Sequence, residues 1–77
     1  MRQCIGDHAY EFIVASDLER DGMCLEVTDA GKTEGVVLEI FYSDKTHEMS
    51  VTVCRPPLPL ELVERAISHA KARLAPG

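Results

Sequence analysis

The spacing of the apolar residues changes at Pro56, and this change restricts the chain to a sheet followed by a helix. Before Pro56, apolar residues recur at every second position, as they do from 49 to 53, which is the period of a half-buried strand. After it they recur every three or four positions from 62 to 74, which is the period of an amphipathic helix. The prolines within 56–59 cannot donate hydrogen bonds to a ladder, so the sheet has to end there.

Four stretches carry the strand pattern, and each places its apolar members on one face. These members are Tyr10, Phe12 and Val14; Met23, Leu25 and Val27; Val36, Leu38, Ile40 and Tyr42; and Met49, Val51 and Val53. The links between the stretches are short and rich in turn residues, which makes consecutive strands antiparallel neighbours. We therefore predict an α+β fold in the order ββββα: a four-stranded antiparallel meander sheet at about 9–55, a prolyl linker at 56–59 and one C-terminal helix at about 59–74, packed on one face. At 77 residues, the chain is expected to form a single small globular domain over 1–77.

The apolar pattern also predicts which residues face each other in the first two hairpins. In the second hairpin Val27 pairs with Val36, and this pairing centres a two-residue turn on Gly31–Lys32. In the first hairpin we favour a tight turn at Asp21–Gly22, with a broad loop over 17–22 as the alternative.

The third hairpin and the helix complete the predicted core. Leu38 pairs with Val51 across a turn centred between Asp44 and Lys45. The apolar stripe of the helix then covers the sheet, and we expect Ile67 to be buried against Leu38.

The sheet face away from the helix is mixed in character, and we take it, with the last strand, as the candidate interaction surface. Its members are Ile13, Cys24, Val37, Phe41, Ser50, Thr52 and Cys54. A solvated face that carries scattered apolar residues is the alternative. The last strand of the meander lies at an edge, and its β-favouring run over 49–54 contains no charge, so this edge invites pairing with another chain. Either a covering segment, 2–5 or the prolyl linker, or a symmetric homodimer would satisfy the edge.

Charge and hydropathy exclude two classes of partner. A formal net charge of −5 argues against nucleic acid, because modules that bind nucleic acid concentrate Lys and Arg on one face. No apolar run is longer than Phe12–Ala15, whereas a membrane helix needs roughly 20 residues, so no membrane partner is expected. Residues 1–4 lack the apolar core of a signal peptide, and we expect a cytoplasmic location.

The residues that could carry chemistry form no motif. The three cysteines are widely separated, and His8, His47 and His69 lack the spacing of metal ligands, so we predict no metal site. Cys4 lies close to His8 in sequence, but no acid to orient the histidine is apparent, and we expect a mobile terminal segment there. No glycine-rich phosphate loop is present, so we predict no cofactor, no catalytic residues and no enzymatic activity.

These observations favour a small cytosolic protein–protein interaction module that binds another protein or itself, as a homodimer, through the open sheet face or the edge of the last strand. The alternative is a module that binds a small ligand between sheet and helix, or an accessory subunit of an enzyme complex. A pocket of several hundred Å³ would favour the alternative, and a packed core would favour association.

Overall fold

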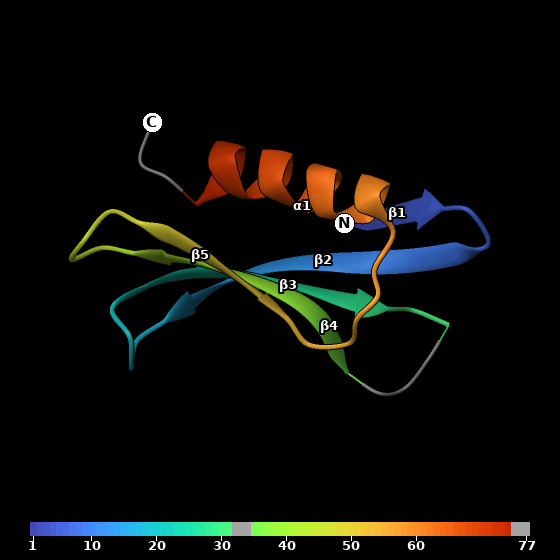
Figure 1. Ribbon diagram of the computed structural model, residues 1–77. Helices are drawn as coiled ribbons and strands as arrows, with labels where there is room; N and C mark the ends of the chain where they lie inside the picture. The colour runs from blue at the N-terminus through green and yellow to red at the C-terminus, as the bar shows by residue number, and fades with distance from the viewer. Residues whose placement is uncertain (32–34, 75–77) are drawn as a thin grey trace.

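The computed structural model describes residues 1–31 and 35–74 and shows one antiparallel sheet with a helix on one face (Figure 1). The elements are β1 (Arg2–Ile5), β2 (His8–Asp17), β3 (Gly22–Asp29), β4 (Val36–Ser43), β5 (Met49–Val53) and α1 (Leu60–Arg73). The strands follow each other across the sheet in the order β1-β2-β3-β4-β5, which is a meander. The α+β class and the C-terminal helix are confirmed, and the sheet has five strands where the sequence predicts four.

The additional strand is β1, which is predicted from the sequence to be a mobile segment or a cover for the edge of the last strand. Its residues Arg2 to Ile5 pair with β2, at the opposite edge of the sheet from β5. Gly6 has a φ of 60°, a conformation that glycine adopts without steric cost, and this allows the tight turn between the two strands. The N-terminal ammonium group donates to the Phe12 carbonyl oxygen at 2.9 Å and so fixes the end of the chain. The predictions that this segment is mobile, or that it covers the other edge, are therefore wrong.

The second and third hairpins pair in registers that differ from the predicted ones. Val27 faces Leu38 in place of Val36, and Val51 faces Ile40 in place of Leu38. From Leu38 onward each register is displaced by two residues, which keeps these paired side chains on their predicted faces because the side-chain period of a strand is two. Val36 pairs with Thr28 beyond an irregularity in the ladder, so its predicted place on the helix-facing side is wrong. Lys32 of the predicted Gly31–Lys32 turn lies outside the described residues.

The loop between β4 and β5 shows why the register moves. The Ser43 carbonyl oxygen accepts a hydrogen bond from the His47 N–H at 2.8 Å, which closes one helical turn. The Ser43 hydroxyl oxygen accepts two more, from the N–H groups of Lys45 and Thr46, at 3.2 Å each. His47 ends this turn with a φ of 63°. This helical turn therefore replaces the predicted turn centred between Asp44 and Lys45.

The first hairpin follows the broad-loop alternative. Asp17 pairs with Gly22 across the loop, so the favoured tight turn at Asp21–Gly22 is wrong. The Asp17 carboxylate accepts a hydrogen bond from the Arg20 N–H at 3.1 Å and thereby stabilises the loop from within. A side chain at Gly22 would overlap the Tyr42 carbonyl oxygen, so β3 has to begin with glycine.

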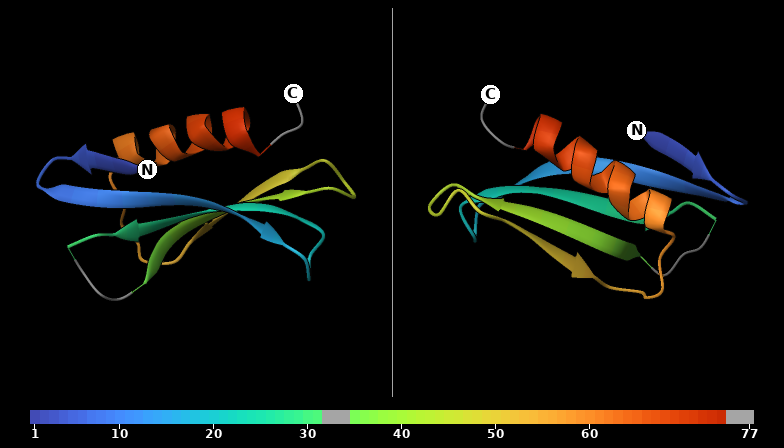
Figure 2. Two further views of the ribbon diagram at one scale, coloured as in Figure 1. Left: turned by 180° about the vertical axis from the view of Figure 1, so that it is seen from behind. Right: turned by 45° about the horizontal axis from the view of Figure 1, so that its top comes forward.

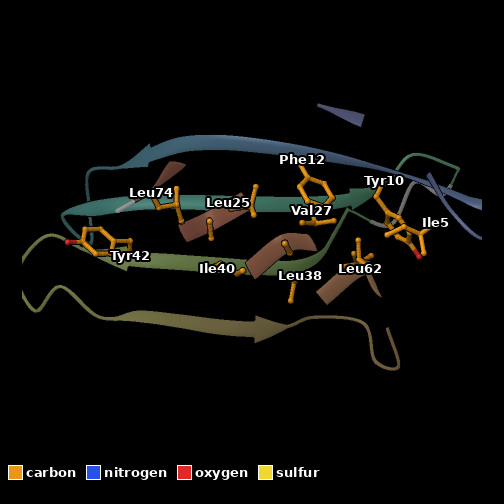
Figure 3. Close-up of a cluster of buried hydrophobic side chains, with 13 residues drawn as sticks. Ile5, Tyr10, Phe12, Leu25, Val27, Leu38, Ile40, Tyr42, Leu62 and Leu74 are labelled. Atoms are coloured by element: carbon orange, nitrogen blue, oxygen red, sulfur yellow. The ribbon is translucent and has the colours of Figure 1, made fainter. Parts of the chain in front are cut away.

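The core lies between α1 and the central strands (Figure 3). Leu62, Ala66 and Ala70 are fully buried on the helix, and their small or compact side chains allow the helix to approach the sheet closely. Ile67 is 36% exposed, because Ala66 occupies the sheet-facing position of that helical turn. The prediction that Ile67 is buried against Leu38 is therefore wrong.

One helix does not cover five strands. It packs on β3 and β4, and Figure 2 (right) shows β5 lying beside the area that the helix covers. Val51 and Val53 of β5 point to the helix side, opposite Ile40 and Leu38, yet they are 48% and 45% exposed. Among the described residues, no helix has the length and apolar character needed to cross a membrane.

Candidate functional site

The open face of the sheet offers less surface than the sequence predicts. Of its predicted members, Ile13 is 48% exposed, but Cys24 and Val37 are each only 6% exposed and offer no contact area to a partner. Val37 is buried because a bulge in the ladder leaves it as an extra residue between Val36 and Leu38, and the bulge turns its side chain into the core.

Arg20 covers another predicted member of this face. Its guanidinium group lies 4.2 Å from the centroid of the Phe41 ring, within the range of a cation–π contact. The same group donates to Asp17 Oδ2 at 2.6 Å and to Glu39 Oε1 at 3.2 Å. The loop before β3 thus folds back over the open face and leaves Phe41 half-buried.

Three side chains on this face meet closely enough to hold a metal ion. The thiol of Cys24 and the carboxylates of Glu26 and Glu39 place their ligand atoms within 4.8 Å of one another. Burial raises the pKa of the Cys24 thiol, and the negative charges of Glu26 and Glu39 raise it further. The neutral thiol is therefore favoured, and Arg20 already compensates the charge of Glu39. The prediction that the chain has no metal site stays a prediction.

The remaining predicted members, Ser50, Thr52 and Cys54, are exposed on or directly after β5. The ladder explains which backbone groups of this strand are free. Glu48 O and Cys54 N bond to β4, and bonded residues alternate along an antiparallel pair. The N–H and C=O groups of Met49, Val51 and Val53 consequently point away from β4, toward the outer edge. No strand in the described part of the chain pairs with that edge.

An apolar groove runs between this edge strand and the helix. It has a volume of about 160 Å³ and is lined by Ile40, Met49, Val51, Ile67, Ala70 and Lys71. The sequence pattern does not predict this groove, because it places Val51, Val53 and Ile67 in the core. One helix of 14 residues is too narrow to cover a sheet of five strands, and this mismatch indicates that one edge has to remain uncovered.

The opposite end of the sheet holds a histidine with an orienting acid, and the sequence does not predict this pair. His8 Nδ1 lies 2.9 Å from Asp29 Oδ2, and the two residues come from neighbouring strands. Asp29 pairs with Tyr10 in the observed register. The favoured tight turn at Asp21–Gly22 displaces β3 along β2 and so hides this contact.

Comparison of the chain with protein families, with curated proteins and with solved structures finds no match. The function therefore has to be inferred from the geometry of these surfaces.

Proposed function

We propose that this chain is a small interaction module that self-associates as a homodimer, with β5 of one copy paired to β5 of the second. The observation that carries the proposal is the uncharged edge of β5, whose outward N–H and C=O groups lie beside the exposed side chains of Val51, Val53 and Ile67. Pairing at this edge would satisfy the ladder groups and bury the apolar groove in one contact. A cytoplasmic location, in which Cys4, Cys24 and Cys54 stay reduced, is part of this proposal.

The strand is complementary to itself in a symmetric register. If the two-fold axis passes through Val51, the outward groups of Val51 meet those of its copy, and the outward groups of Met49 meet those of Val53. On the helix side this register places valine and methionine side chains against each other. On the open side it places the Ser50 hydroxyl beside the Thr52 hydroxyl, which can donate and accept in turn.

Charge also favours this edge over the other surfaces. The chain has a formal net charge of −5, so two copies repel each other wherever carboxylates meet. The open face carries Glu26 and Glu39, whereas β5 carries no charge from Met49 to Val53. Antiparallel pairing additionally brings the acidic Glu48 of one copy toward the basic Arg55 of the other at each end of the contact.

The test compares two charge substitutions at equally exposed valine and isoleucine positions. Val51→Lys places two ammonium groups on the two-fold axis of the proposed contact, and burying them should weaken the dimer by roughly two orders of magnitude or more. Ile13→Lys is the matched control, since Ile13 is also 48% exposed but lies on β2 and on the other face. Light scattering from low to high micromolar protein should show a dimer for the wild type and the control, and a monomer for Val51→Lys.

A wild-type protein that stays monomeric throughout this concentration range would contradict the proposal. Equal loss of the dimer in both variants would also contradict pairing through β5. It would mean that the copies meet through the open face, or that any added positive charge weakens the dimer. Circular dichroism of each variant confirms that the fold persists, which the exposure of both positions leads us to expect.

A further inference from the structure

The open sheet face carries three metal-ligating side chains that the proposed dimer does not use. Glu26 of β3 lies directly opposite Glu39 of β4 in the ladder, and Cys24 precedes Glu26 by two residues, on the same face. The ligand atoms of the three side chains lie within 4.8 Å of one another. Two neighbouring strands therefore bring one sulfur donor and two carboxylate donors to one point.

The charges at this point are only partly balanced. Like charges directly opposite each other destabilise a strand pair. Arg20 donates to Glu39 Oε1 at 3.2 Å, but its guanidinium group is shared with Asp17. The carboxylate of Glu26 forms no ion pair with any residue that the structure describes. A cation bound between the two glutamates would compensate the remaining negative charge.

The thiol of Cys24 independently indicates a ligand. The residue is 6% exposed, and its Sγ atom is directed at the two carboxylates. Within the described ranges 1–31 and 35–74, this thiol forms no hydrogen bond and no disulfide. A buried free cysteine ordinarily behaves as a small apolar residue, yet this one faces two acids. Burial and those acids raise the pKa of the Cys24 thiol, and a bound cation would reverse this effect because it favours the thiolate.

We propose that Cys24, Glu26 and Glu39 bind a zinc ion. Thiolate ligands suit zinc, whereas magnesium and calcium take oxygen ligands. Zinc binds tetrahedrally to three protein ligands and one water molecule, with ligand atoms roughly 3 to 4 Å apart, and rotation of the two glutamate side chains closes the remaining distance. Glu39 can bind through Oε2, because the bond from Arg20 occupies Oε1. Binding releases the thiol proton to water, and the prediction that the chain has no metal site would then be wrong.

The test titrates zinc chloride and cobalt(II) chloride, separately, into the reduced full chain at neutral pH. Calorimetry should show one zinc ion bound per chain with a Kd below about 100 µM. Cobalt(II) accepts the same ligands, and its thiolate complexes absorb in the near ultraviolet through charge transfer from sulfur. This band therefore reports directly whether a thiolate holds the metal. Magnesium in millimolar excess should not remove the band, since it does not compete for sulfur.

Matched variants separate this site from binding at the other thiols and acids. Cys24→Ser should abolish the cobalt–thiolate band, whereas Cys54→Ser removes an exposed thiol away from the glutamates and should leave the band unchanged. Glu26→Gln keeps the size of the side chain and breaks no ion pair of the described fold, so it should stay folded and weaken zinc binding at least about tenfold. Glu64→Gln, on the exposed surface of the helix, should bind zinc as the wild type does.

Three results would overturn the proposal: no saturable zinc binding below about 100 µM, a cobalt–thiolate band that survives Cys24→Ser, or unchanged zinc affinity in Glu26→Gln. The calorimetric titration needs only the wild-type protein, so it does not depend on the folding of a variant. The dimer is tested by light scattering of variants at other positions, so each of the two proposals can fail without the other.

Discussion

Arg20 determines how much of the open sheet face remains available to a partner. Its guanidinium group covers the Phe41 ring and bridges Asp17 to Glu39, so one side chain converts an apolar position into part of a charged network. The thiol of Cys24 lies beneath the same network and is buried. The open face is consequently a polar, acidic surface on which Ile13 and the small side chain of Ala15 are exposed.

Burial of Cys24 predicts a difference in thiol reactivity. Alkylation requires the thiolate, and burial holds the pKa of Cys24 above its ordinary value of 9.0, whereas Cys4 and Cys54 are exposed. In the folded protein two thiols should react rapidly and the third at least about tenfold more slowly. Iodoacetamide labelling followed by peptide mass spectrometry assigns each rate, and Cys24→Ser should remove only the slow phase. Rapid labelling of Cys24 in the native protein would contradict its burial.

The same pKa shift has a consequence for stability. The folded chain holds the Cys24 proton more tightly than the unfolded chain does, so the stabilisation is present below the ordinary pKa of the thiol. It is lost as the pH rises from that value through the raised one.

At the residue scale the sequence predicts which face of the sheet a side chain occupies better than it predicts which residue that side chain contacts. His8 and Asp29 lie far apart in the sequence, and their contact follows only from the register of β2 against β3. The width of the loop between β2 and β3 sets this register and therefore decides which residue of β3 lies beside His8. The polar residues at 17–22 are compatible with a tight turn and with a broad loop, so the sequence does not decide between them.

At the scale of the elements, the sequence predicts which face of the sheet most strand residues occupy, but it does not predict the register between strands. The alternation of apolar residues assigns the paired side chains of β3, β4 and β5 to their faces from Leu38 onward, because the period of a strand is two. The register depends on local backbone geometry, here on the helical turn that begins at Ser43 and on the bulge at Val37. The spacing of apolar residues indicates neither of these features. The short polar strand β1 carries no alternation either, and only its pairing with β2 reveals it.

The orientation of α1 yields a prediction for the helix. Leu62 is fully buried, so Leu62→Ala should lower the free energy of unfolding by about 2 to 5 kcal/mol, enough to unfold much of so small a domain. Ile67 is 36% exposed at the rim of the groove, so Ile67→Ala should cost about 1 kcal/mol or less in the monomer. Urea titrations of the two variants, in the Val51→Lys background that removes the proposed dimer, measure this difference. A larger effect at Ile67 would mean that the helix is rotated relative to the sheet.

At the scale of the whole molecule, the proportions of the fold account for its exposed edge. One helix of 14 residues covers the centre of the sheet, and β1 is held to it by Arg65, which donates to Gln3 Oε1 at 2.9 Å. The strand at the other edge, β5, has no such connection among the described side chains, and its apolar residues remain half in solvent. The sequence predicts an uncharged edge strand. It does not predict that the helix lies too far from that strand to bury it, because the position of a helix on a sheet follows from packing.

Dimerisation through β5 would link the stability of each chain to its concentration. A tenfold rise in protein concentration changes the free energy of a dimer by about 1.4 kcal/mol, or about 0.7 kcal/mol per chain. For a domain of this size that is a rise of about 3 to 6 °C in the midpoint of thermal unfolding. Calorimetry of the wild type and of Ile13→Lys should show this dependence, whereas Val51→Lys should unfold at one temperature at every concentration. A wild-type midpoint that does not move with concentration would mean that the folded chain stands alone, and the edge of β5 would then be a solvated edge that only a different protein could cover.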